Sequence, residues 1–244
     1  MPGKRRADQL LVEMGLMPSR ARAQAEILAG HVRAGGKIVR KPSDVLPGDA
    51  EIAVDNANPY VSRGALKLVA ALDALQIDLA GRCVLDLGAS TGGFTQVALM
   101  RGARHVTALD VGHGQLHATL RDDPRISLVE GVNARDLTSA HLPERPDTIL
   151  ADLSFISLSL ALPPALTLAA PRAVLIALIK PQFEAGRAHI GKGGIVRDAQ
   201  VHQEVCERMA AFLLAAGWRV LGLIESPVLG GDGNKEFLIG ARRD

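Results

Sequence analysis

The C-terminal three quarters of the chain alternate short apolar segments with amphipathic ones, and this alternation restricts the possible folds more than any other feature. From Ser62 onward, segments of strand length and segments of helical periodicity follow one another, as is typical of a doubly wound α/β domain. We expect helices over 65–75 and 199–216, and strands over 83–87, 105–110, 126–130, 148–152, 174–179, 218–224 and 236–241. A loop joins the last two strands, which predicts a seven-strand sheet whose final strand is antiparallel.

A glycine-rich turn follows the first of these strands, in the run VLDLGASTGGF at positions 84–94. A buried strand that enters such a turn and then opens a helix lets backbone N–H groups approach a ligand closely. The spacing matches neither the G-x-G-x-x-G of dinucleotide-binding proteins nor a Walker loop. Asp110 ends the next strand, 24 residues after Asp86, where a carboxylate can accept hydrogen bonds from both hydroxyls of a ribose. A tight turn without ligand and a solvated strand end are the alternatives, and the placement of both features at strand ends favours a ligand.

Together these features resemble the S-adenosylmethionine (SAM) site of class I methyltransferases, whose sheet has the seven-strand layout predicted above. The resemblance implies SAM as the cofactor, with Asn133 after the third strand as a contact for the adenine. The implied cofactor-binding residues are Asp86, Gly88, Ala89, Ser90, Thr91, Gly92, Gly93, Asp110 and Asn133.

Four charged residues stand near predicted strand ends or on the helix before the first strand. Asp152 and Lys180 each end an apolar strand, Glu236 follows a glycine-rich segment, and Lys67 lies in the first helix. Taken singly, each is more often a surface charge. In order and context they resemble the Lys-Asp-Lys-Glu tetrad of FtsJ-like ribose 2′-O-methyltransferases.

Positive charge is concentrated at the N-terminus. Residues 1–41 contain nine Lys/Arg and three acids, and since the whole chain has a formal net charge of +2, the remaining 203 residues sum to −4. Helical patterns over 8–14 and from Ser19 to Gly30, followed by strand patterns over 31–33, 37–39 and 51–54, predict a small α+β unit. A solvated basic face and a polyanion-binding surface are both compatible with the charge alone.

The runs RADQLLVEMGLMPSRARAQAEILAGHV (6–32) and KPSDVLPGDAEIAV (41–54) resemble the S-four-type RNA-binding domain. We therefore expect this domain over 1–55, a linker over 56–62 and an FtsJ-like methyltransferase domain over 63–244. The implied RNA-binding residues are Arg5, Arg6, Arg20, Arg22 and Lys41.

Five segments extend the resemblance to the TlyA family, whose members are also called hemolysin A: YVSRGALKL (60–68), GASTGGFT (88–95), DVGHGQL (110–116), ADLSFIS (151–157) and KPQFE (180–184). The resemblance implies SAM-dependent methylation of a cytidine 2′-hydroxyl in ribosomal RNA, within ribosomal subunits. A ribose hydroxyl is a weak acid and must lose its proton as it attacks the methyl group. We expect Lys180 to act as base beside Lys67, with Asp152 orienting it and Glu236 positioning the hydroxyl or Lys67.

Other function classes fit less well. Only two cysteines, Cys83 and Cys206, are present, which indicates a reducing, cytoplasmic setting and excludes a disulfide framework. The sequence predicts neither a secretion signal nor a membrane span, which disfavours a pore-forming protein. His113 and His117 have helical spacing but lack an evident third ligand, so no metal is expected. A ribosome-assembly factor with a vestigial site is a further alternative, which SAM binding would distinguish.

Overall fold

A computed structural model describes residues 3–17, 19–28, 30–54 and 59–243. The chain forms two compact units, Met1–Pro59 and Tyr60–Asp244, which are treated separately below. Residues 56–58 of the predicted linker lie outside the described residues. Next to them, the Val61 N–H donates to Gln96 Oε1 at 2.7 Å, so the start of the C-terminal unit is attached to a helix of that unit.

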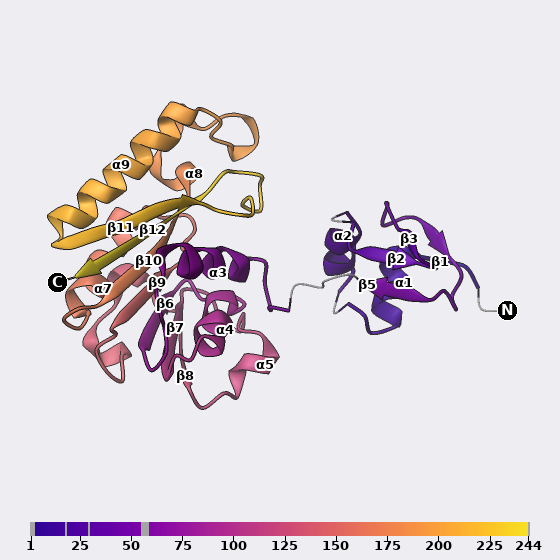
Figure 1. The fold of residues 1–244 in the computed structure, drawn as a ribbon, viewed down its shortest axis with the longest axis horizontal. Coiled ribbons are helices and arrows are strands. Elements are labelled where there is room, and N and C mark those ends of the chain that lie inside the picture. Colours follow the sequence, from indigo (N-terminus) through magenta and orange to yellow (C-terminus); the bar gives the residue numbers. More distant parts are fainter. Residues whose placement is uncertain (1–2, 18, 29, 55–58, 244) are drawn as a thin grey trace. The chain divides into compact units, whose positions relative to one another are not determined.

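The C-terminal unit contains one seven-stranded sheet in the order β11-β12-β10-β9-β6-β7-β8 (Figure 1). The strands are β6 (Cys83–Leu87), β7 (His105–Asp110), β8 (Ile126–Glu130), β9 (Thr148–Ala151), β10 (Val174–Ile179), β11 (Trp218–Glu225) and β12 (Phe237–Arg243). Within this sheet β12 is antiparallel to both of its neighbours, which confirms the predicted final antiparallel strand. β9 ends one residue before Asp152 and β12 begins one residue after Glu236, so both carboxylates lie just outside the sheet.

Helices cover both faces of the sheet because its central strands bury side chains on both sides. In β10, Val174, Ile176 and Leu178 pack against one core, whereas Leu175, Ala177 and Ile179 pack against the other. The first core includes apolar residues of α3 (Gly64–Leu75) and α4 (Gly93–Met100). The second includes those of α6 (Leu158–Ala161), α7 (Pro163–Leu168) and α9 (Ala199–Ala215). Short α5 (Ala118–Arg121), α8 (Pro181–Glu184) and the 3₁₀ turns η1 (Ala134–Asp136), η2 (Ser139–His141), η3 (Arg187–His189) and η4 (Lys192–Gly194) complete the unit.

The N-terminal unit has its own small core, formed by Ala7, Leu11, Met17, Ala23, Ile27, Val32 and Val39. Its elements are β1 (Arg5–Arg6), α1 (Ala7–Glu13), α2 (Arg20–Leu28), β2 (Val32–Ala34), β3 (Lys37–Ile38), β4 (Val45–Leu46) and β5 (Ile52–Val54). β3, β2 and β5 form an antiparallel sheet, and β1 pairs with β4. The two-residue strands β1 and β4 are too short to leave a periodic pattern, so the sequence did not predict them.

None of the helices in the described ranges is long and apolar enough to cross a membrane.

Candidate active site

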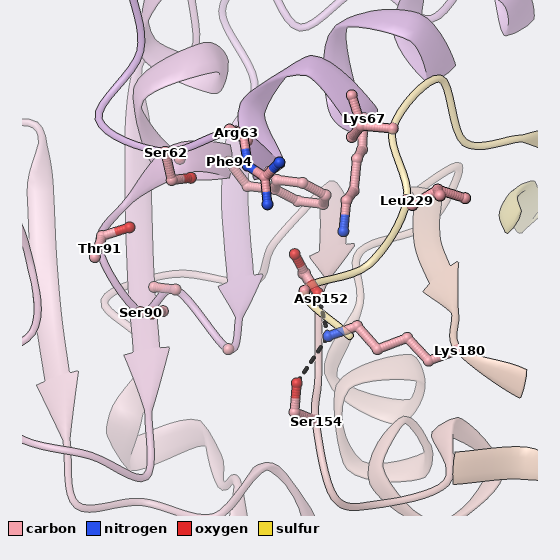
Figure 2. Close-up of a pocket in the computed structure, with 16 residues that line it drawn as sticks. Ser62, Arg63, Lys67, Ser90, Thr91, Phe94, Asp152, Ser154, Lys180 and Leu229 are labelled. Atoms are coloured by element: carbon pink, nitrogen blue, oxygen red, sulfur yellow. Dashed lines mark hydrogen bonds and ion pairs between the residues drawn. The ribbon is translucent and has the colours of Figure 1, made fainter. Parts of the chain in front are cut away.

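A hollow of about 450 Å³ lies at the carboxyl ends of the central strands of the C-terminal unit. Figure 2 shows its lining, to which α3, the glycine turn and the ends of β9 and β10 all contribute. The residues predicted from the sequence that line it are Lys67, Gly88, Ala89, Ser90, Thr91, Gly93, Asp152 and Lys180. The topology of a parallel sheet thus brings together side chains that are far apart in the sequence.

Lys180 is held at the end of the all-apolar strand β10. Its Nζ lies 2.7 Å from Asp152 Oδ1 and donates to Ser154 Oγ at 2.8 Å, as the dashed lines in Figure 2 show. Its side chain is only 10% exposed, and Pro181 begins α8 directly after it. The predicted pairing of Lys180 with Asp152 is therefore present, and Ser154 is a partner that the sequence did not predict.

Lys67 lines the hollow and pairs with Glu236, which lies outside the lining. Lys67 Nζ lies 2.5 Å from Glu236 Oε2, and the two side chains are 10% and 3% exposed. In Figure 2 Lys67 points from α3 towards Asp152. Two buried lysine–carboxylate pairs therefore flank the same space, and Glu236 contacts Lys67, one of the two roles expected for it.

The loop that carries Glu236 is anchored by Asn234, which is fully buried. Its Oδ1 accepts from the Val196 N–H at 3.0 Å, and its Nδ2 donates to the Gly194 carbonyl at 3.0 Å. A Cβ on Gly230 would lie 2.5 Å from Glu236 Oε1, so any larger residue there would displace this carboxylate. Asn234 was missed because an asparagine in a glycine-rich loop reads as a turn residue.

The glycine turn packs against the end of β9. Gly88 has φ +80°, and a Cβ there would lie 2.5 Å from the Asp152 carbonyl oxygen. Any larger residue would separate the turn from Asp152, so Gly88 couples the predicted cofactor loop to the lysine pairs.

A second hollow, of about 570 Å³, continues from Gly88 and is lined by Asp110 and Asn133. Asp110 accepts from the N–H groups of Ser90 at 2.8 Å and Gly112 at 2.7 Å, which fixes its carboxylate at the end of β7. Asn133 Oδ1 accepts from the Arg135 N–H at 3.1 Å and so begins η1. An acid, an amide and a glycine turn around one cavity suit a nucleoside such as the adenosine of SAM.

Of the residues predicted for the site, Asp86, Gly92 and Glu236 lie outside those that line the two hollows. Asp86 is fully buried and accepts from Thr95 Oγ1 at 2.6 Å, while its other oxygen has no hydrogen-bond partner among the described residues. Burial raises the pKa of Asp86 to about 7, and the nearby carboxylates of Asp152 and Asp110 add to the shift. A direct contact between Asp86 and a cofactor stays a prediction.

Residues 152–158 and 180–184 form one wall of the site. We call the contacts between these two segments the clasp. They join Lys180 to Asp152 and Ser154, Phe183 to Phe155, and Glu184 to Ser157 and Leu158. The Phe rings lie 5.3 Å apart at 52°. Phe155 is 91% exposed and has φ +64°, an unusual conformation for an aromatic residue.

Glu184 closes the far end of the clasp. Its Oε2 accepts from Ser157 Oγ at 2.6 Å and its Oε1 from the Leu158 N–H at 2.7 Å. Burial raises the pKa of Glu184, and these two hydrogen bonds oppose the shift. The sequence analysis predicted the contact of Lys180 with Asp152, but it did not predict the contacts of Phe183 and Glu184 with the other segment.

In the N-terminal unit, four of the five predicted RNA-binding residues form ion pairs. Arg5 lies 3.5 Å from Glu13, Arg22 2.9 Å from Glu26, and both Arg6 and Arg20 lie 3.0 Å from Asp8. The backbone N–H of Lys41, the fifth, donates to Asp44 at 3.0 Å. The arginines are therefore fixed by neighbouring acids, although Arg5, Arg6 and Arg20 keep 56%, 43% and 53% of their side chains exposed.

Asp8 organises this surface from a fully buried position. It accepts from Arg6, from Arg20 and from Gln24 Nε2, the last at 2.8 Å. The hydrogen bonds from Arg6 hold the pKa of Asp8 well below its usual range. The sequence analysis counted Asp8 only as one acid against the basic residues.

Potential metal ligands are not gathered anywhere in the described part of the chain, where no group of three or more His, Cys, Asp or Glu side chains could hold an ion. His117 Nδ1 instead accepts from the Thr119 N–H at 3.3 Å.

Comparison with known proteins identifies both units. The family model of FtsJ-like methyltransferases matches residues 60–243, and that of the S4 domain matches residues 5–52. The 16S/23S rRNA (cytidine-2′-O)-methyltransferase TlyA of Mycobacterium tuberculosis is 44% identical over 99% of this chain and 91% of its own length. Hemolysin A of Brachyspira hyodysenteriae is 37% identical over 96% of this chain and 98% of its own.

A solved structure described as a hemolysin of Streptococcus thermophilus superposes with a TM-score of 0.78 at 40% identity, covering 100% of this chain and 89% of that one. The extent of these matches agrees with the fold and with the resemblance seen in the sequence. The chain therefore belongs to the FtsJ-like methyltransferase family, in the TlyA group that also carries an S4 domain.

Proposed function

We propose that this protein transfers a methyl group from SAM to a ribose 2′-hydroxyl of ribosomal RNA, that of a cytidine. The observation that carries the proposal is the pair of buried lysine–carboxylate contacts beside the glycine turn, Lys180 with Asp152 and Lys67 with Glu236. The M. tuberculosis relative is named for this reaction, which supports the substrate class. Ribosomal subunits are the partner in this proposal, and the cytoplasm is the compartment.

The residues around the second hollow fit SAM. Asp110 is held where it can accept from ribose hydroxyls, Asn133 can face the adenine, and Gly88 lets the glycine turn pack against Asp152 at the edge of the hollow. When bound, SAM supplies an electrophilic methyl group. The protein then has to orient the ribose and accept one proton.

Lys180 accepts that proton in the proposed mechanism. Its amine form takes the proton of the 2′-hydroxyl as the ribose oxygen attacks the methyl group, and becomes an ammonium that Asp152 and Ser154 stabilise. Lys67, held by Glu236, positions the hydroxyl. The S4 domain would bind RNA through phosphates, with Arg5, Arg6, Arg20, Arg22 and Lys41 as its basic residues.

Two measurements test the proposal. Isothermal titration calorimetry should show SAM binding, and mass-spectrometric mapping should find a 2′-O-methyl group on ribosomal RNA only when active protein and SAM are both present. Absence of SAM binding, with or without RNA, would contradict the methyltransferase function. That outcome would favour the assembly-factor alternative, whereas SAM binding without methylation of either ribosomal subunit would contradict ribosomal RNA as the substrate.

A further inference from the structure

A hollow of about 500 Å³ lies at the end of the strands opposite to the candidate active site. It is lined by four arginines, Arg82, Arg172, Arg242 and Arg243. Arg82 immediately precedes β6, Arg172 lies just before β10, and Arg242 and Arg243 end the antiparallel strand β12. All four therefore lie at the amino ends of the parallel strands. The candidate active site lies at the carboxyl ends, so this arginine hollow is a separate feature.

Among the described residues, few side chains are placed to neutralise the charge of these arginines. Arg82 is 3.9 Å from Asp147, and Arg243 donates to the carbonyls of Leu166 at 3.1 Å and Ala169 at 3.4 Å. Arg172 and Arg242 are exposed, and the guanidinium group of neither forms an ion pair or hydrogen bond with another residue of the described ranges. Two guanidinium groups thus remain available in a cavity that already contains two more.

Packing does not account for this arrangement. Like charges in one hollow repel one another, and residues 60–244 carry 19 Lys/Arg against 19 Asp/Glu, so the cluster is not a by-product of a basic unit. Arg172 has φ +62°, a left-handed conformation that normally favours glycine or asparagine in a turn. An arginine kept at a strained position is better explained by a ligand than by the turn itself.

We propose that the arginine hollow binds phosphates of the RNA backbone and is a second RNA contact of the C-terminal unit. The planar guanidinium group donates parallel hydrogen bonds that match phosphate oxygens, and arginine is favoured where such recognition is needed. The six residues of β10 separate the arginine hollow from the candidate active site by about 20 Å, a distance that folded ribosomal RNA easily exceeds. The inference rests on the proposed function for the identity of the RNA.

The test compares two double variants that change the net charge equally. Arg172→Glu/Arg242→Glu alters the hollow, whereas the control Arg101→Glu/Arg125→Glu alters arginines outside it that are already paired with Asp73 at 2.8 Å and Asp123 at 2.6 Å. The full-length proteins are titrated separately with purified small and large ribosomal subunits over a salt series. We expect the hollow variant to bind its subunit about tenfold more weakly than the control, with a slope of log K against log salt that is smaller by about one to two.

A second variant guards against misfolding. Arg172→Gly removes one charge and suits the positive φ, so it should preserve or raise the melting temperature while weakening subunit binding by roughly threefold. Equal affinities of wild type, control and both hollow variants would overturn the proposal. So would stabilisation by inorganic phosphate alone that the double variant abolishes while subunit affinity is unchanged, because the hollow would then bind a free anion and not RNA.

The result is separable from the proposed function. Subunit affinity is measured directly, so it tests the arginine hollow whether or not methyl transfer is detected. A wild-type protein that binds subunits but transfers no methyl group would count against the proposed function alone.

Discussion

The two units each bury an aspartate completely, and the two carboxyl groups have opposite properties. Asp8 in the N-terminal unit accepts hydrogen bonds from Arg6, Arg20 and Gln24, and the hydrogen bonds from Arg6 hold its pKa well below the usual range. Asp86 in the C-terminal unit has only Thr95 as a hydrogen-bond partner among the described residues, and burial raises its pKa to about 7. Burial alone therefore does not set the charge of a carboxyl group, whereas its partners do.

The difference corresponds to what each region has to do. Arginine stays protonated at all relevant pH values, so Asp8 holds in place positive charges that are always available to bind a phosphate. Lysine can lose its proton, and the pairs of Lys180 with Asp152 and of Lys67 with Glu236 stand where a proton has to move. One region maintains fixed charge, while the other contains groups able to exchange a proton.

The largest expected effect comes from replacing a lysine of the C-terminal unit by arginine, the residue that maintains fixed charge in the N-terminal unit. Lys180→Arg keeps the positive charge beside Asp152 but removes the ability to accept a proton, so methyl transfer should fall by about two orders of magnitude or more. Fold and SAM binding should persist. Single-turnover transfer from labelled SAM to ribosomal subunits measures the effect, and near-wild-type activity would exclude Lys180 as the base.

Lys67→Arg should have a smaller effect in the same assay. Lys67 is held by Glu236, and an arginine can keep that ion pair and the positive charge near Lys180. The ratio of the two losses distinguishes the base from the positioning residue. A greater loss for Lys67→Arg than for Lys180→Arg would transfer the role of base to Lys67.

Asp8→Asn tests the fixed charges of the N-terminal unit. We expect Asp8→Asn to weaken RNA binding several-fold, because Asp8 positions Arg6 and Arg20. If these arginines acted merely as charge, the loss of a negative group would instead strengthen binding. The lost charge-assisted hydrogen bonds should also lower the free energy of unfolding by roughly 1–3 kcal/mol. Filter binding and denaturant titration measure the two effects. Glu13→Gln, which also removes one acid but an exposed one paired with Arg5, is the control and should not weaken binding.

The last expected effect concerns the pH dependence of stability. Because the folded-state pKa of Asp86 is raised to about 7 from 3.8, the folded protein retains a proton that the unfolded chain has lost, and stability should decline as pH rises from about 4 through 7. Asp8 has the opposite shift, so its contribution is lost only as pH falls below about 4. Melting temperatures between pH 5 and 8, without SAM, should fall less in Asp86→Asn than in wild type. Parallel curves would show that Asp86 is ionised throughout this range.

The sequence predicted the sheet well because its strands are buried on both faces and separated by clear turns. It also placed Asp152 and Lys180 correctly, since the ends of adjacent parallel strands must meet. Between Lys67 and Glu236, which are 169 residues apart, it left two roles for Glu236 open, and only the structure shows their contact. It did not predict the hydrogen bonds of Asn234 to residues 38 and 40 positions away. The organising role of Asp8 was missed for a related reason. A net charge only subtracts the acids from the basic residues and does not show which residues an acid contacts.

The clasp has a consequence for how opening of the site could be observed. The Leu158 N–H donates to the carboxylate of Glu184 and not to a backbone carbonyl, so its protection from hydrogen exchange depends on the two segments staying together. The same segments carry Asp152 and Lys180, and their separation would expose the proposed base to bulk water. The exchange rate of this single amide would therefore report how often the catalytic wall opens in solution, before any substrate is present.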